Sequence, residues 1–142
     1  MKRFLCAVII LCFVPIFAVA LDLSEFNACS AVLGAPELDL SDAKTVDEYT
    51  RFISDKCFIF FVEDGGNLQS IYIDGQGDSF LAYCCAALHL FDPSGSTNNH
   101  GQLLTMYLMA HRDAEHQAGQ TTNGLFMFVE PSDNGYLFMI GE

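Results

Sequence analysis

Residues 57–75, CFIFFVEDGGNLQSIYIDG, decide the fold of this chain. The segments 57–62 and 68–73 are both rich in aromatic and β-branched side chains, which favour β-strands. Between them, Asp64-Gly65-Gly66-Asn67 is typical of a tight turn, because glycine adopts the positive φ that such turns require. The stretch therefore predicts an antiparallel β-hairpin.

A second hairpin is predicted at the end of the chain, with strands over 125–129 and 136–140 around a turn at 131–135. The triplet Phe-Val-Glu at 61–63 recurs at 128–130, and Asn67 recurs as Asn134, each 67 residues later. This match is typical of an internal duplication. Independent selection of similar residues by similar hairpins would give the same match, so both interpretations stay open.

Each predicted hairpin follows two predicted helices. The first helix begins near Ser24 and ends before Gly34, and the second begins at 41–42 and continues to Ile53. The third covers 79–91 and the fourth covers 101–117, with a loop between them. The sequence thus predicts an α+β fold with four helices and a four-stranded, mostly antiparallel sheet in ααββααββ order.

Three of the four predicted strands are continuous apolar runs, without the alternation expected of a sheet that is wetted on one face. Both faces of the sheet therefore need cover. Four helices are available, which favours helices on both sides. The alternative is that helices cover one side and a second copy of the chain covers the other, which would make the protein a homodimer.

Residues 1–20 have the pattern of a signal peptide. Lys2 and Arg3 precede an apolar run, and Ala18-Val19-Ala20 supplies the small residues that a signal peptidase reads. Pro15 interrupts the run and no positive cluster follows it, which favours cleavage over a retained membrane anchor. We therefore expect a secreted or periplasmic protein with one acidic domain over 21–142 and no stable membrane span after cleavage.

The charge of residues 21–142 restricts the class of partner. This segment keeps four basic side chains against 18 acidic ones, a formal net charge of −14. Such a surface repels nucleic acid and anionic lipid headgroups, so no nucleic acid partner is expected. A basic protein is the partner that the charge favours, although the charge also serves simply to keep an apolar domain in solution.

Four cysteines remain after the leader: Cys29, Cys57, Cys84 and Cys85. In an oxidising compartment an even number predicts two disulfides. Cys84 and Cys85 are adjacent, and their Cα atoms lie too close for a disulfide in a helix. Two pairings remain open, in which Cys29 and Cys57 each bond to one of the adjacent pair, and buried free thiols are the alternative.

One set of residues suggests hydrolytic chemistry. Ser79 follows Gly77-Asp78 at a predicted helix start, and Asp113 precedes His116 in an Asp-x-x-His string. A serine nucleophile and a histidine oriented by an aspartate are parts of an acyl hydrolase. Together with Asn98-Asn99, these strings resemble the blocks of GDSL-type hydrolases over about forty residues; the resemblance implies a catalytic Ser79 and His116. That family has a larger parallel α/β sheet, and the simpler interpretation is a capped helix start and a solvated helix end.

His111 and Glu115 are the weak candidates for metal ligands, because residues four apart share a helix face. Zinc needs three or four converging ligands, and the spacing places only two. The sequence therefore predicts neither a metal site nor a cofactor.

These observations favour a binding protein over an enzyme. The preferred hypothesis is an exported acidic, disulfide-containing module that binds or inhibits a cationic protein, as a periplasmic immunity protein does. The first alternative is a small secreted serine hydrolase that uses Ser79 and His116. The second alternative is a structural subunit of an envelope assembly, suggested by the apolar strands.

Overall fold

The computed structural model describes residues 22–142. The predicted signal peptide and its cleavage site lie outside the described residues. No helix of the described part is long and apolar enough to span a bilayer. The helices there are α1 (Leu23–Val32), α2 (Gly77–Phe91) and α3 (Ser96–Asp113), with short 3-10 helices η1 (Leu40–Asp42) and η2 (Pro93–Gly95). The strands are β1 (Lys44–Val46), β2 (Tyr49–Ser54), β3 (Cys57–Asp64), β4 (Asn67–Gly75), β5 (Gln117–Gln120), β6 (Phe126–Ser132) and β7 (Gly135–Gly141).

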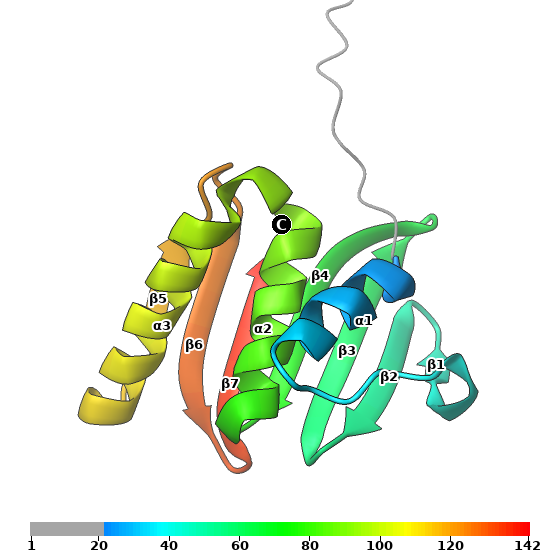
Figure 1. Cartoon of the computed structure of the whole chain (residues 1–142), viewed down its shortest axis with the longest axis horizontal. Coiled ribbons are helices and arrows are strands. Elements are labelled where there is room, and N and C mark those ends of the chain that lie inside the picture. Colours follow the sequence, from blue (N-terminus) through cyan, green and yellow to red (C-terminus); the bar gives the residue numbers. More distant parts are fainter. Residues whose placement is uncertain (1–21) are drawn as a thin grey trace, which may run out of the picture.

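The seven strands form one antiparallel sheet in the order β1-β2-β3-β4-β7-β6-β5 (Figure 1). Two runs of consecutive strands, β1–β4 and β5–β7, meet where β4 pairs with β7. At this seam Ile71 lies opposite Ile140 and Ile73 lies opposite Phe138, and all four side chains are buried. Both predicted hairpins are present, as β3–β4 and β6–β7.

The predicted four-stranded sheet with four helices is wrong. The segment expected to form the second helix, 41–53, instead forms η1, β1 and most of β2. The segment 49–53 alternates in burial, with Thr50 and Phe52 inside, as a strand requires. Two turns in left-handed backbone, at Asp47 (φ 54°) and at Asp55-Lys56 (φ 46° and 63°), separate β1, β2 and β3. The fold remains α+β.

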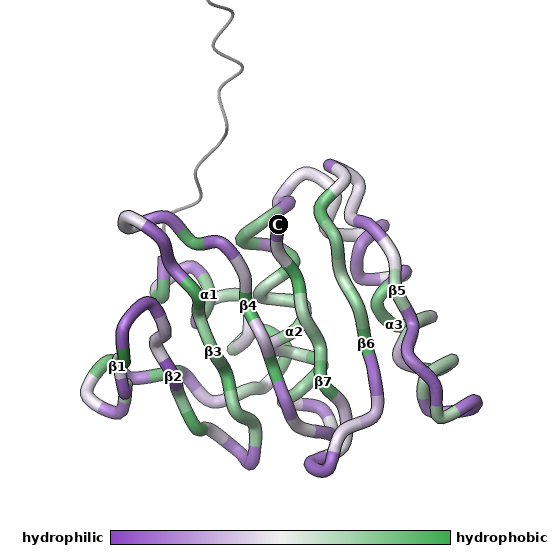
Figure 2. The backbone as a smooth tube through the Cα atoms, turned by 180° about the vertical axis from the view of Figure 1, so that it is seen from behind, coloured by the Kyte–Doolittle hydropathy of each residue, from purple (hydrophilic) through white to green (hydrophobic). Residues whose placement is uncertain are grey.

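All three helices lie on the same face of the sheet, so the expectation of helices on both sides is also wrong. Seen from behind, the sheet has no helix in front of it (Figure 2). The helix-facing side chains of the central strands are fully buried, among them Ile59, Phe61, Ile73, Phe138 and Ile140. We call the other side of the sheet the open face.

The structure does not support an internal duplication. One helix precedes the first hairpin and two precede the second. The matching triplets also lie in opposite orientations: Phe61 is buried under the helices, whereas Phe128 pairs with Met139 on the open face. A β-bulge at Val62/Glu63 interrupts the register of β3–β4, and β6–β7 has no such interruption.

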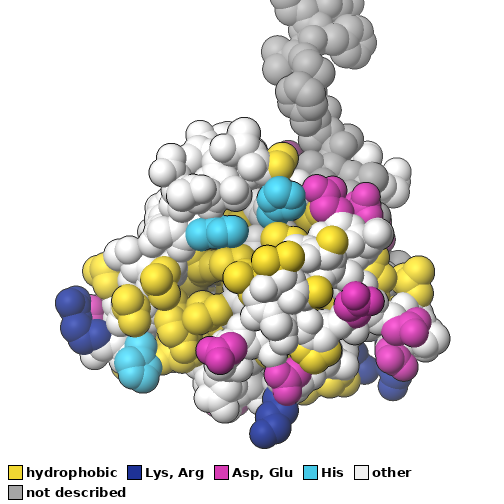
Figure 3. All heavy atoms as spheres, in the orientation of Figure 1, with side chains coloured by type: hydrophobic (Ala, Val, Ile, Leu, Met, Phe, Trp, Pro, Cys, Tyr) yellow, Lys and Arg dark blue, Asp and Glu magenta, His cyan; other side chains and the backbone are white. Residues whose placement is uncertain are grey.

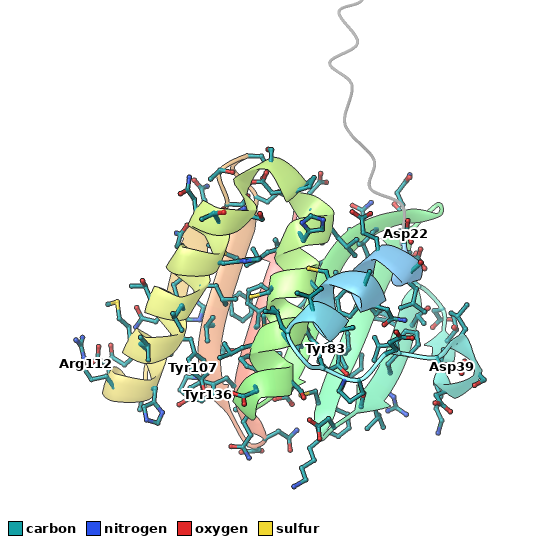
Figure 4. The ribbon with its side chains drawn as sticks, viewed as in Figure 1. Asp22, Asp39, Tyr83, Tyr107, Arg112 and Tyr136 are labelled. Atoms are coloured by element: carbon teal, nitrogen blue, oxygen red, sulfur yellow. The ribbon has the colours of Figure 1, made fainter. Side chains whose placement is uncertain are left out.

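The core lies between the sheet and the helices and is largely aromatic. Phe26 of α1 packs edge-on against Phe61 of β3, with ring centroids 5.2 Å apart, and stacks on Tyr83 of α2 at 5.9 Å. On the other side of α2, Tyr107 and Tyr136 lie together with centroids 4.8 Å apart (Figure 4). The hydroxyl of Tyr83 donates to the carbonyl of Pro36 at 2.7 Å, which ties the chain after α1 to the core.

A buried carboxylate joins the helices to the β5–β6 connection, at one edge of the sheet. Asp92 lies between α2 and η2 and is 2% exposed. It accepts hydrogen bonds from the Asn99 side-chain amide (3.0 Å), the Thr122 hydroxyl and the Asn123 backbone N–H (3.0 Å). Since Thr122 and Asn123 belong to the connection between β5 and β6, Asp92 fixes this connection to the junction of α2 and α3.

Candidate functional site

The open face carries a broad apolar surface. Its centre is built from side chains that are neighbours across the strands, where Phe60 of β3 lies opposite Tyr72 of β4, and Tyr72 lies opposite Met139 of β7. The apolar side chains of this face are Val46, Tyr49, Ile53, Phe58, Phe60, Val62, Tyr72, Phe126, Phe128, Leu137 and Met139. All are partly or well exposed, with Ile53 at 55% and Tyr49 at 52%. A sheet face that meets only water is usually polar, so this face has the composition of a contact surface.

Two adjoining hollows lie on the open face. The first, of about 340 Å³, is lined by Tyr49, Phe60, Val62, Ser70, Tyr72, Asp74 and Leu137. The second, of about 360 Å³, is lined by Lys44, Val46, Tyr49, Arg51 and Phe60. Because Tyr49 and Phe60 line both, the hollows form one continuous depression near the β1–β2 side of the sheet.

An acidic rim borders one end of the sheet. It consists of Asp47, Glu48, Glu63, Asp64 and Glu142. The backbone N–H of Glu63 donates to the carbonyl of Glu48 at 3.0 Å, which joins the β1–β2 turn to the end of β3. The backbone N–H of Glu142 donates to Gln69 of β4 at 3.2 Å, so the last residue lies at this end too. Carboxylates gathered at one end of the apolar surface produce a negative potential there.

Two more carboxylates on the open face are held by neighbours. Asp74 accepts from the Ser132 hydroxyl at 2.5 Å and from the Asn134 amide at 2.8 Å, which fixes the β6–β7 turn beside β4. Glu130 of β6 lies 3.1 Å from His116 Nδ1. These contacts keep the second hairpin in position around the apolar surface.

Ser79 is held at the start of α2, on the helix side of the sheet. The residue is buried, with 8% of its surface exposed, and its hydroxyl donates to the carboxylate of Asp55 in the β2–β3 turn. The structure therefore gives the candidate nucleophile a carboxylate partner from the turn that follows the segment predicted as the second helix.

The other two candidate catalytic residues have partners of their own. Asp113 forms a bidentate pair with the adjacent Arg112, with both N–O distances at 2.6 Å. The ring of His116 bonds to Glu130 and lies 5.1 Å, between centroids, from Phe128 on the open face. The hydrogen bonds of Ser79, Asp113 and His116 thus run to three different partners, and the structure does not assemble these residues as a triad.

We expect Ser79 to resist a serine-directed fluorophosphonate, because its hydroxyl is buried and donates to a carboxylate rather than to a histidine. Intact mass spectrometry after incubation with the reagent checks this. Labelling that disappears in Ser79→Ala and is reduced in His116→Ala would contradict the expectation and restore the hydrolase hypothesis.

The two candidate metal ligands do not share a helix face. Helix α3 ends at Asp113 and Ala114 is left-handed (φ 54°), so Glu115 lies beyond the helix. Sequence reasoning extended this helix to 117, which placed Glu115 one turn after His111. His111 Nδ1 lies 2.6 Å from the Tyr136 hydroxyl. Among the described residues no group of three or more His, Cys, Asp or Glu side chains is arranged to hold a metal ion.

The predicted disulfides are not formed in the structure, where all four described cysteines are free thiols. Cys57 and Cys84 are fully buried, while Cys29 and Cys85 are half-buried. Burial raises the pKa of Cys84 well above its ordinary value, and burial together with the nearby Cys29 raises the pKa of Cys85 to about 11. Reactive cysteines have lowered pKa values, so these thiols are unsuited to nucleophilic catalysis.

The helix side of the molecule has an apolar hollow of its own. A groove of about 330 Å³ is lined by Leu33, Asp78, Leu81, Ala82, Cys85, His100, Leu103 and Leu104. Figure 3 shows apolar side chains gathered in a depression between α2 and α3. Cys85, which is half-buried, lines this groove.

Comparison of the chain with models of protein families, with curated proteins and with solved structures finds no match. The functional assignment therefore depends on the surfaces described above.

Proposed function

We propose that this protein is an exported binding module of the inhibitory, immunity-like kind, which docks a cationic protein partner on its open sheet face. The observation that carries the proposal is the apolar open face, which has a depression lined by Tyr49, Phe60 and Tyr72 and is bordered by the acidic rim. The proposal extends to export, for which the support is the leader pattern of residues 1–20.

The size and composition of the open face support docking of a protein. Seven strands about 4.8 Å apart, with a mean length of about 20 Å, cover roughly 700 Å². Each partner of a stable protein–protein interface buries about 800 Å². Tyrosine, phenylalanine, methionine and arginine are enriched at such interfaces, and Tyr72, Phe60, Met139 and Arg51 meet in one row across the sheet.

The overall charge supports a cationic partner whose basic side chains meet the acidic rim, because Lys44 and Arg51 already line the second hollow. Residues 21–142 carry a formal charge of −14, and the acidic rim lies at the end of the apolar surface. Opposite charge on the partner would accelerate encounter, and apolar burial on the open face would then hold the complex. Binding of this kind weakens as salt screens the charges.

We expect Tyr49→Ser to weaken partner binding at least tenfold while leaving the fold intact, because Tyr49 lines both hollows and is 52% exposed. The matched control is Leu108→Ser, which removes an apolar side chain of similar exposure (56%) from α3, on the helix side. Immobilised wild-type and variant proteins are incubated with the extracellular or periplasmic fraction of the producing organism at low ionic strength.

The proposal is supported if one basic protein binds wild type and Leu108→Ser, is released by 0.5 M salt, and is lost from Tyr49→Ser. Equal capture by Tyr49→Ser, or capture of an acidic protein that resists salt, would overturn it. Sedimentation of the purified protein is the companion measurement. A stable homodimer that Tyr49→Ser dissociates would mean that a second copy, rather than a cationic partner, occupies the open face.

A further inference from the structure

Helices α1 and α2 cross one another and run in opposite directions (Figure 1). At one end, Glu25 Oε1 of α1 lies 3.2 Å from His89 Nε2 of α2. At the other end, Leu33 and Leu81 line the same groove. We call these facing residues of α1 and α2 the ladder. Along each helix its members are four residues apart, which is about one helical turn.

The middle step of the ladder is a pair of cysteines. Cys29 is four residues after Glu25 and four before Leu33, and Cys85 is four residues before His89 and four after Leu81. Residues four apart share a helix face, so Cys29 lies on the same face of α1 as Glu25, and Cys85 lies on the same face of α2 as His89. The two cysteines therefore lie on the facing sides of the two helices. The pKa of Cys85 agrees with this placement, since burial raises it most and the charge of the nearby Cys29 raises it further.

We infer that Cys29 and Cys85 are a disulfide site, which closes between α1 and α2 when the protein meets a disulfide oxidant. The inference assigns Cys85 as the disulfide partner of Cys29. Sequence spacing alone left Cys84 and Cys85 as equal candidates for that partner. Cys84 is fully buried and lies about 100° around α2 from Cys85, so it is turned away from the ladder. The inference does not depend on the proposed partner.

The reaction needs a low-molecular-weight disulfide such as oxidised glutathione. The thiolate of Cys29 attacks one glutathione sulfur, which forms a mixed disulfide and releases one glutathione. The thiolate of Cys85 then attacks the Cys29 sulfur and releases the second glutathione. Two thiols are oxidised, one disulfide is reduced, and two protons pass to the released glutathiones. Both cysteines are half-buried, and the groove beside α2 gives access to Cys85.

The bridge would fasten α1 to the body of the protein. A covalent link between residues 29 and 85 closes a long loop, which restricts the unfolded chain and stabilises the fold. We expect reduction to lower the Tm of the oxidised protein by about 10 °C. High thiol pKa values are typical of such a structural bridge rather than of a redox-active one.

The test uses the purified protein, oxidised with glutathione disulfide, blocked with N-ethylmaleimide and digested with trypsin. Cleavage at Lys44 and Lys56 separates the peptide of Cys29 from the peptide 57–112, which holds Cys57, Cys84 and Cys85, so the variants decide which of the three is bonded. We expect wild type and Cys84→Ala to give a cross-linked peptide that reduction splits, and Cys85→Ala and Cys29→Ala to give none.

A cross-link that persists in Cys85→Ala, or is lost in Cys84→Ala, would overturn the assignment. Wild-type protein in which Cys29 stays fully alkylated after oxidation would overturn the inference itself. The Tm shift gives a second measurement: reduction should leave the Tm of Cys85→Ala unchanged, and an equal shift in this variant would place the bridge elsewhere.

Discussion

Phe26→Ala is expected to lower the free energy of unfolding by about 4 kcal/mol. Phe26 is fully buried and touches two elements at once, with its ring edge-on to Phe61 and stacked on Tyr83. Its removal leaves a cavity between α1, the sheet and α2, which rigid aromatic neighbours cannot fill. Urea denaturation followed by circular dichroism measures the loss.

The control for this prediction is Val32→Ala, on the same helix. Val32 is 85% exposed, so its truncation should change stability by less than about 0.5 kcal/mol. A loss below about 1 kcal/mol in Phe26→Ala would mean that α1 contributes little to the core and that its packing against Phe61 is incorrect.

Asp92→Ala should lower the free energy of unfolding by about 3 kcal/mol at pH 7. The change leaves the fully buried Asn99 amide without an acceptor, and it also removes the acceptor of the Thr122 hydroxyl and of the backbone N–H of Asn123. Ser94→Ala is the matched control. Ser94 is exposed and makes one 3.2 Å hydrogen bond to the same carboxylate, so its loss should cost less than about 1 kcal/mol.

The same carboxylate predicts a dependence on pH. Burial by itself raises the pKa of Asp92, but hydrogen bonds donated by Thr122, Asn99, Asn123 and Ser94 outweigh it and lower the pKa from 3.8 to about 2. A lowered pKa in the folded state stabilises the protein above pH 4, and this contribution is lost as the pH falls from about 4 to about 2. The urea concentrations that half-unfold wild type and Asp92→Ala should therefore approach each other as the pH falls to 2. A difference that stays constant would contradict the role of the ionised carboxylate.

Much of the fold could be predicted from local signals in the sequence. The two hairpins follow from aromatic and β-branched runs around glycine turns, and α2 follows from a long apolar stretch after Gly77. The segment 41–53 misled the prediction, because Val46, Tyr49, Phe52 and Ile53 fit a helical period as well as two short strands. Pairing with β3 decides between the two, and that contact is not local.

Two other features could not be predicted for related reasons. Strand β5, Gln117–Gln120, lacks β-forming side chains. It forms because its backbone pairs with the free edge of β6. Continuous apolar strands indicated that both sheet faces needed cover, but the sequence did not reveal that all helices would lie on one face. The open face was missed as a site for this reason, although its residues Phe58, Phe60 and Val62 were visible in the predicted strand.

The candidate hydrolase residues show that short sequence motifs do not predict which side chains will be hydrogen-bond partners. Ser79 and His116 stand in strings that resemble a known family, yet their partners, Asp55 and Glu130, come from elements that the strings do not include. Such partners depend on the tertiary fold. The ladder between α1 and α2, in contrast, is regular in the sequence and becomes informative once two helices are known to be antiparallel.

The seam between β4 and β7 has a consequence for how the chain reaches its folded state. Strands β1 to β4 are consecutive and can pair as soon as they leave the ribosome, but β4 gains its second neighbour only after residue 141 has been synthesised. Until then, β4 has an unpaired edge next to Ile71 and Ile73. An exposed apolar edge recruits other strands, so the nascent chain is most prone to aggregate just before its last strand is complete.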